Sequence, residues 1–298
     1  FQPNLITTQN PWGEGLIGLI ISKIIKCNFL PQLHTDITSH YWLKRKPLLR
    51  AIRKTTSIFV LKKSKIIRLV SNSQKKKIAK YLLISKTKLK VVPVAITLKE
   101  NNKKYINYPK NKEDLNRKTI LFIGRFDEVK DLNLWVETAK QINSIFPKVV
   151  FKMIGNGPQF DEIKLKVDKL NLTESFTFTG AIPSIEINEH FTKNTILLLT
   201  SHYEGFGRVL VEAMSNKIPC ISTECTGPND IIVNKKSGYI IKERKPTIIA
   251  NACCKLIKDK NLYEKMSKNS YLKFKNNFEF KKISDNYVQL LLEGANLN

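Results

Sequence analysis

Short apolar runs alternate with amphipathic stretches along the second half of the chain. Residues 119–123 read Thr-Ile-Leu-Phe-Ile, and the apolar residues of 132–142 then recur at spacings of three and four, as on one face of a helix. The alternation continues with apolar runs at 149–154, 175–178, 196–199, 218–222 and 237–241, separated by helical patterns at 160–170, 209–214 and 248–256. Runs that are apolar throughout predict a parallel sheet covered by helices on both faces. Such sheets bind ligands at the carboxyl ends of their strands.

The first half follows the same plan less regularly. Strands are expected at 4–7, 28–33, 67–70 and 89–94, and helices at 15–26 and 48–65. A polar stretch rich in Lys and Asn then joins the two halves. We therefore expect one α/β domain over residues 1–104, a linker over 105–118 and a second α/β domain over 119–278.

The chain is strongly basic, and its charge is unevenly placed. Its 298 residues carry 51 Lys and Arg against 25 Asp and Glu, a net charge of +26, while 42% hydrophobic residues exclude a disordered chain. Residues 1–118 hold +21 of this charge and residues 119–298 only +5. The codon usage of an AT-rich genome explains abundant lysine but not its concentration in one half.

A basic half can bind an anionic lipid surface, an acidic substrate or nucleic acid. Nucleic acid is disfavoured because the lysine runs at 62–63 and 75–77 contain no aromatic residues that would stack on bases. No string typical of a zinc finger or an RNA-recognition motif is present either.

Cysteine usage and hydropathy bear on the compartment. Five Cys without a C-x-x-C spacing indicate reduced thiols in a cytosolic protein rather than disulfides or a zinc site. The chain contains no run of about 18 apolar residues, so no membrane-spanning helix is expected. No signal peptide opens the chain. The first residues look like the middle of a domain, so we expect a fragment that lacks its N-terminal part.

Two turns after predicted strands carry candidate phosphate chemistry. Arg125 and Lys130 flank the turn between a strand and a helix, where cations and backbone N–H groups favour a phosphate or diphosphate. Lys130 alone is equally well explained as a solvated residue at a helix start. Gly155 and Gly157 follow the next strand and let a ligand approach the backbone, although a tight turn without a ligand explains them as well.

Two glutamates lie eight positions apart after the run at 196–199. Glu204 falls in the loop and Glu212 in the following helix, where a carboxylate is suited to accept hydrogen bonds from vicinal hydroxyls. The alternative for Glu212 is an ion pair with Arg208 at i,i+4. We expect His202 to be a solvent-facing loop residue.

Together these segments resemble the motifs of retaining, nucleotide-sugar-dependent glycosyltransferases of family 4, within the glycosyl transferases group 1. In chain order the matching segments are Gly124-Arg125 with Lys130, Gly155-Asn-Gly157-Pro158, Phe178-Thr-Gly180 to Pro183, Glu204 to Glu212 as E-x7-E, Gly227-Pro228-Asn-Asp230 with Asp in place of the family's Glu, and Gly238. Six motifs in order over residues 119–241 make the resemblance specific. Upstream it is weaker and rests on the Gln9–Pro11 segment and on His34-Thr-Asp36.

The resemblance implies the GT-B fold, which is α/β with two Rossmann-like domains facing across a cleft. The N-terminal domain, incomplete here, would hold the acceptor, and the C-terminal domain would hold the nucleotide-sugar. Residues 279–298 would form a last helix that returns to the N-terminal domain.

The resemblance also implies transfer of a hexose-type sugar from a nucleotide diphosphate-sugar with retention of configuration. Catalytic roles would fall to Arg125 and Lys130, which neutralise the departing diphosphate, to Glu204 and to His34, which contacts the donor sugar unless it is a satisfied core histidine. Substrate-binding roles would fall to Glu212 at the ribose and to Gly124, Gly155, Gly157, Gly205, Phe206 and Gly207. The chain has no D-x-D motif, so no metal or other cofactor is expected.

The expected acceptor is a glycan or a lipid-linked molecule of cell-surface polysaccharide or glycolipid biosynthesis. The expected location is cytoplasmic, at the inner face of the cell membrane, where a basic cluster would bind anionic headgroups; it comprises Lys44, Arg45, Lys46, Arg50, Arg53 and Lys54. No nucleic acid partner is expected. Two alternatives stay open: another GT-B enzyme, such as a nucleotide-sugar epimerase or a phosphorylase, and a non-catalytic basic protein associated with membrane or nucleic acid.

Overall fold

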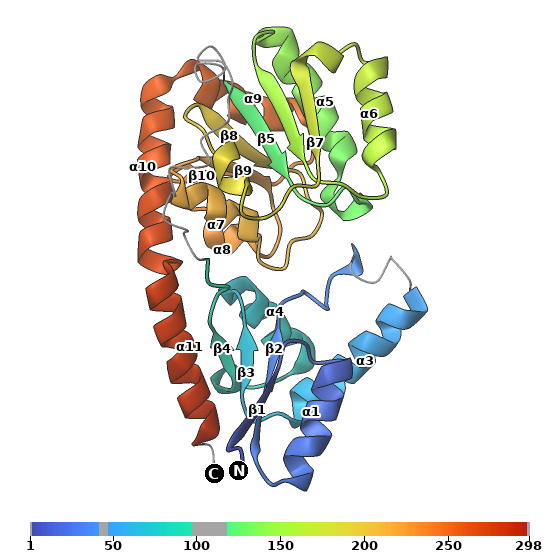
Figure 1. The fold of residues 1–298 in the computed structure, drawn as a ribbon, viewed down its shortest axis with the longest axis vertical. Coiled ribbons are helices and arrows are strands. Elements are labelled where there is room, and N and C mark those ends of the chain that lie inside the picture. The colour runs from blue at the N-terminus through green and yellow to red at the C-terminus, as the bar shows by residue number, and fades with distance from the viewer. Residues whose placement is uncertain (1, 42–46, 97–117, 297–298) are drawn as a thin grey trace. The chain divides into compact units, whose positions relative to one another are not determined.

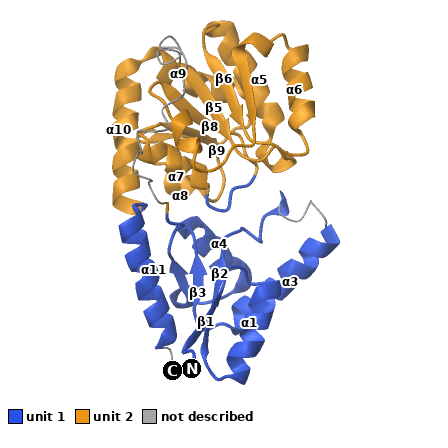
Figure 2. Ribbon diagram, viewed as in Figure 1, with its two compact units in different colours: residues 1–95, 203–206, 278–298 blue, residues 96–202, 207–277 orange. Residues whose placement is uncertain are grey.

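Two parallel sheets organise the chain, each in its own unit. The computed structural model describes residues 2–41, 47–96 and 118–296. Unit 1 comprises residues 1–95, 203–206 and 278–298, and unit 2 comprises residues 96–202 and 207–277 (Figures 1 and 2). Apart from Lys118, the linker expected at 105–118 lies outside the described residues.

Unit 1 contains a four-stranded sheet in the order β1-β2-β3-β4, with every neighbouring pair parallel. The strands are β1 (Leu5–Thr8), β2 (Asn28–Leu33), β3 (Ile67–Leu69) and β4 (Leu89–Val91), and the helices are α1 (Gly13–Ile24), α3 (Pro47–Lys63), α4 (Asn72–Leu82) and α11 (Phe280–Ala295). All four strands expected in this half are confirmed. Helix α4 was not expected.

The two faces of this first sheet are covered by different helices. Leu33 packs in a cluster with residues of α3 and α4, among them Leu61 and Ile78. Leu30, three positions earlier on the same strand and hence on the opposite face, packs with Ile283 and Leu290 of α11. The C-terminal helix therefore completes the core of unit 1.

Unit 2 contains a six-stranded parallel sheet in the order β10-β9-β8-β5-β6-β7. The strands are β5 (Thr119–Ile123), β6 (Val150–Ile154), β7 (Phe176–Gly180), β8 (Thr195–Leu199), β9 (Cys220–Thr223) and β10 (Gly238–Ile241). The chain proceeds outward from β5 to β7, returns to β8 beside β5, and proceeds outward the other way. This is the doubly wound Rossmann order, in which ligands bind outside the carboxyl ends of the strands where the winding reverses. That point lies between β5 and β8.

The helices of unit 2 are α5 (Leu132–Ile145), α6 (Phe160–Lys169), α7 (Arg208–Ser215), α8 (Pro228–Ile231), α9 (Pro246–Lys258) and α10 (Lys260–Asn277). Aromatic side chains form the part of the core that lies around α5. Trp135 of α5 is fully buried, with its ring centroid 6.4 Å from that of Phe122 and 5.9 Å from that of Phe176. Its indole N–H donates to the carbonyl of Leu198 at 3.0 Å. Trp135 therefore fixes α5, and the turn before it, against β5 and β8.

Two parallel sheets with helices between their strands confirm the α/β class and the two Rossmann-like domains of a GT-B fold. All five cysteines are free thiols. Within residues 2–41, 47–96 and 118–296, no helix combines the length and hydropathy needed to cross a bilayer.

Candidate functional site

The turn that follows β5 brings Lys130 back onto the end of the strand. Residues Glu128–Lys130 form a 3-10 turn, and α5 starts directly after it. A Cβ on Gly124 would lie 3.6 Å from Cε of Lys130, so the lysine stem passes over Gly124. Arg125 is exposed, with Nε 3.7 Å from Oδ2 of Asp127. Both cations thus belong to the carboxyl edge of β5, next to the point where the winding reverses.

The glycines after β6 pack against this same turn. Gly155 has φ +134°, and a Cβ on it would lie 1.8 Å from the carbonyl oxygen of Gly124. A Cβ on Gly157 would lie 2.3 Å from the carbonyl oxygen of Phe126. The N–H of Phe126 donates to the carbonyl of Asn156 at 3.0 Å, which joins the two turns. Backbone packing accounts for both glycines, and their assignment to substrate binding stays a prediction.

Glu212 lies in α7, which follows β8 across the reversal point. Gly207, with φ +93°, precedes the helix. Oε1 of Glu212 accepts a hydrogen bond from Nε of Arg208 at 2.7 Å, and the Glu212 side chain is 13% exposed. The i,i+4 ion pair offered as an alternative is therefore present. The ion pair orients the Glu212 carboxylate, and the role of Glu212 at a ribose stays a prediction.

The remaining predicted site residues belong to unit 1. His34 follows β2, and its Nε2 lies 3.1 Å from Oε1 of Gln9. Burial, and secondly the charge of Arg68, lowers the pKa of His34 to about 4, so the imidazole is neutral at pH 7. Glu204, Gly205 and Phe206 are grouped with His34 in this unit.

Contacts inside unit 1 explain the residue types at Gly205 and Phe206. A Cβ on Gly205 would lie 2.4 Å from the carbonyl oxygen of His34, so only glycine fits there. Phe206 is buried and packs edge-on against Phe278, with ring centroids 6.0 Å apart. Glu204 has a polar interaction of its own, and its assignment to the donor sugar stays a prediction.

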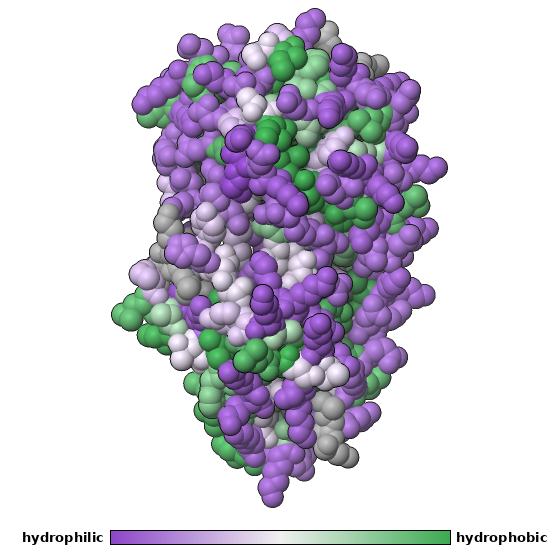
Figure 3. Space-filling model, turned by 180° about the vertical axis from the view of Figure 1, so that it is seen from behind, coloured by the Kyte–Doolittle hydropathy of each residue, from purple (hydrophilic) through white to green (hydrophobic). Residues whose placement is uncertain are grey.

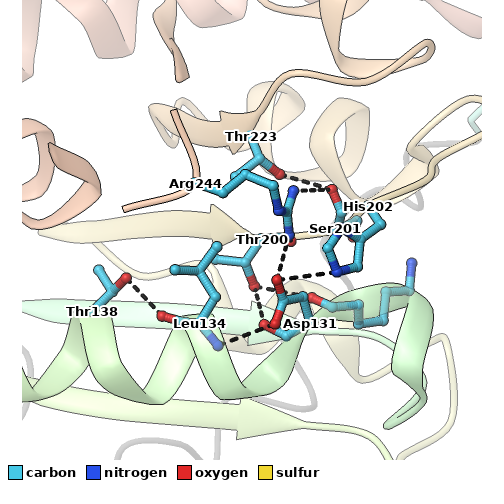
Figure 4. A network of polar contacts seen from close by, with 9 residues as sticks. Asp131, Leu134, Thr138, Thr200, Ser201, His202, Thr223 and Arg244 are labelled. Carbon is cyan, nitrogen blue, oxygen red and sulfur yellow. Dashed lines mark hydrogen bonds and ion pairs between the residues drawn. The ribbon is translucent and has the colours of Figure 1, made fainter. Parts of the chain in front are cut away.

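A polar network in unit 2 holds the Lys130 turn, and sequence analysis missed most of it (Figure 4). Oδ2 of Asp131 lies 2.6 Å from Nη2 of Arg244 and 3.2 Å from Nε2 of His202. The expectation that His202 faces solvent is wrong: its side chain is 22% exposed and contacts the Asp131 carboxylate. The one sequence feature that points to this network is the position of Asp131 directly before a helical pattern, which is typical of an N-cap.

No group of three or more His, Cys, Asp or Glu side chains is arranged to hold a metal ion in the described ranges. The expectation that the chemistry needs no metal or other cofactor stays a prediction.

Comparison with known proteins agrees with this geometry. The model of the family described as glycosyl transferases group 1 matches residues 104–273. The chain belongs to this family. It is 28% identical over 178 residues to a 2-deoxystreptamine N-acetyl-D-glucosaminyltransferase of Niallia circulans, which covers 60% of this chain and 46% of that protein.

Two further proteins extend the comparison over nearly the whole chain. A UDP-Gal:alpha-D-GlcNAc-diphosphoundecaprenol alpha-1,3-galactosyltransferase of Escherichia coli is 26% identical over 295 residues, 93% of this chain and 73% of that protein. The crystal structure of Anabaena HepE in complex with UDP-glucose superposes with a TM-score of 0.81 at 17% identity, covering 97% of this chain and 79% of that one. The chain thus spans less than half of the Niallia protein and about three quarters of the other two.

Proposed function

We propose that this protein is a retaining glycosyltransferase of family 4 that transfers a hexose from a UDP-sugar to a glycan or lipid-linked acceptor of polysaccharide or glycolipid biosynthesis. The observation that carries the proposal is the Rossmann-order sheet of unit 2 with Arg125 and Lys130 at its reversal point. Similarity to a galactosyltransferase named for UDP-Gal and to a structure holding UDP-glucose supports the choice of donor.

The mechanism follows from the charge that the reaction develops. When the bond between sugar and diphosphate breaks, negative charge grows on the β-phosphate, and preorganised cations lower that barrier most effectively. Arg125 offers a planar fork and Lys130 a point charge for this purpose. Glu212 binds the ribose hydroxyls, Glu204 and the Gly205–Gly207 backbone bind the sugar hydroxyls, and neutral His34 orients the sugar for attack on the face that the leaving group vacates.

A thermal-shift screen with UDP, GDP and ADP tests the donor site. We expect UDP to raise the melting temperature, because a ligand that binds only the folded state stabilises it by mass action. Labelled UDP-hexoses then separate two enzyme classes: transfer to an acceptor supports the proposal, whereas an epimerised nucleotide-sugar indicates the epimerase. A sugar 1-phosphate formed from a glycan and inorganic phosphate, without any UDP-hexose, indicates the phosphorylase. No shift with any of the three nucleotides contradicts the proposal and favours the non-catalytic alternative.

We also propose that unit 1 docks on an anionic membrane surface. Helix α1 exposes four isoleucines at helical spacing, Ile17, Ile20, Ile21 and Ile24, and the neighbouring α3 exposes Leu48, Leu49, Ile52 and Phe59. Figure 3 shows hydrophobic side chains gathered along the side of unit 1 where these helices lie. Arg50, Arg53 and Lys54 of the expected basic cluster are half-buried on α3, whereas Lys44 to Lys46 lie outside the described residues. Apolar residues beside cations are typical of an interfacial membrane surface.

Replacing Ile20 and Ile24 by serine should weaken binding to vesicles of anionic phospholipid about tenfold, because both side chains are exposed and contribute apolar contact with the acyl boundary. Vesicle co-sedimentation at low salt measures the effect. Leu165→Ser, at a comparably exposed position of α6 in unit 2, serves as the matched control. Equal binding of the double variant and the control would contradict this surface.

A further inference from the structure

Asp131 holds an unusual backbone conformation at the start of α5. Its φ of 47° and ψ of 57° lie in the left-handed region, which a non-glycine residue occupies only when its surroundings favour it. Its Oδ1 accepts the N–H of Leu134 at 3.2 Å, as an N-cap. Asp131 therefore ends the 3-10 turn that carries Lys130 and begins the helix behind it.

The segment after β8 binds this turn at three consecutive residues. The hydroxyl of Thr200 donates to the carbonyl of Lys130 at 3.0 Å and to that of Asp131 at 2.9 Å. The backbone N–H of His202 donates to the carbonyl of Val129 at 2.8 Å. Carbonyls 129, 130 and 131 are thus all tied to residues 200–202, so the main chain on either side of the Lys130 side chain is fixed.

Arg244, which follows β10, joins both segments. Its Nη1 donates to the carbonyl of Ser201 at 3.1 Å, and its Nη2 donates to the carbonyl of Thr200 and pairs with Oδ2 of Asp131 (Figure 4). Planar guanidinium groups are suited to such forked contacts, which lysine cannot reproduce. Arg244, at the end of β10, therefore fixes both the backbone of residues 200–201 and the carboxylate of Asp131, the residue next to Lys130.

We propose that Arg244 is a positioning residue for the donor diphosphate, acting through Asp131 and the Thr200 segment on Lys130. The effect rests on the proposed function. The forked contacts fix the main chain that holds the lysine stem over Gly124, and a displacement of about 1 Å at such a group is costly to binding and turnover.

A double-mutant cycle on the affinity for UDP tests this pathway. Arg244→Gln should weaken UDP binding about tenfold and leave the affinity for UMP, which lacks the β-phosphate, within about twofold. In a Lys130→Ala background the same substitution should change UDP affinity by less than about twofold, since the group it positions is already gone. Titration calorimetry on the full chain measures all four affinities.

Two further variants guard against an unfolding artefact and a general charge effect. Thr200→Val removes only the hydroxyl that holds carbonyls 130 and 131, and it should reproduce the selective loss for UDP over UMP. Lys245→Gln removes one positive charge from the neighbouring residue, whose side chain is 68% exposed and pairs only with Glu243 among the ion pairs of the described residues. It should leave UDP affinity within about twofold.

The outcomes separate this inference from the proposed function. Losses of Arg244→Gln and Lys130→Ala that multiply independently, or equal losses for UDP and UMP, overturn the positioning role. A Lys245→Gln effect as large as that of Arg244→Gln overturns it as well, because charge alone would then suffice. A wild-type chain that binds none of UDP, GDP and ADP overturns the proposed function and this inference with it.

Discussion

Replacing Lys130 by alanine should lower the turnover of a UDP-hexose by about a hundredfold or more, the usual cost of removing one preorganised group that faces charge developed in a transition state. The lysine stem lies over Gly124 at the end of β5, where the sheet of unit 2 reverses its winding. The departing UDP would then lack its nearest point charge. Release of UDP from the donor, to acceptor or to water, measures the effect.

Lys140→Ala is the matched control for this experiment. Lys140 is exposed on α5, the helix that begins just after Lys130, so its removal takes the same charge from the same element without touching the strand end. Turnover should stay within about twofold of the wild type. If Lys130→Ala retained full turnover while UDP still bound, Lys130 would have no part in stabilising the leaving group.

The expected strands are found in both units because most of them are short runs rich in apolar residues, and the central ones are buried. The run at 119–123 is β5, the run at 28–33 is β2, and the other eight expected strands differ from those observed by at most three residues at either end. A parallel strand between two helical layers is mostly apolar, so the sequence shows approximately where it begins and ends. The order of the strands within each sheet cannot be predicted in this way, because it depends on which apolar runs pair with each other.

Besides the one-turn helix α8, two longer helices were not predicted, because their buried faces contain polar or aromatic residues. Helix α4 buries Gln74 together with Ile78 and Leu82, and its remaining surface is rich in lysine. Helix α10 buries Tyr263, Met266, Ser270 and Phe274 along 18 residues with no strong apolar stripe. Their periodicity is helical, but too few strongly apolar residues mark it.

The motif residues of the candidate site can be predicted from the sequence, but the residues that hold the Lys130 turn in place cannot. Arg125, Lys130 and the glycines were found because family motifs are contiguous, and contiguous residues reveal a turn. Arg244 and Asp131 are 113 residues apart and form an ion pair that only the fold creates. His202 was misjudged for the same reason, since nothing in its neighbours shows that Asp131 lies beside it.

Unit 1 offers a parallel case around Arg68. This buried arginine of β3 donates to the carbonyls of Val92 at 3.1 Å and Pro93 at 2.8 Å, and its guanidinium lies 4.5 Å from the ring of Tyr287 on α11. Burial lowers the pKa of Arg68. Its charge in turn helps to keep His34 neutral. A sequence pattern shows an arginine in an apolar run but not the carbonyls and the aromatic ring that accommodate it.

Gly155→Ala should destabilise unit 2 by about 3 kcal/mol or more, because the substitution adds a backbone clash to an unfavourable conformation. The new methyl would lie 1.8 Å from the carbonyl oxygen of Gly124 at a φ of +134°. Either the turn after β6 or the turn after β5 must move, and the second carries Lys130. Chemical denaturation followed by the fluorescence of Trp135, in a Trp12→Phe and Trp42→Phe background, reports on unit 2 alone.

Two other glycines of unit 2 separate the contributions of strain and clash. Gly180 has a φ of +72° with nothing within 4 Å of an added methyl, so Gly180→Ala measures conformational strain, about 1 kcal/mol. Gly238→Ala would bring a methyl within 2.0 Å of the Cys220 carbonyl without a positive φ, so it measures a clash away from the candidate site. Gly155→Ala should exceed Gly180→Ala in lost stability and, unlike Gly238→Ala, should also weaken UDP binding. A Gly155→Ala chain as stable as Gly180→Ala would mean that the two turns do not pack as tightly as the structure shows.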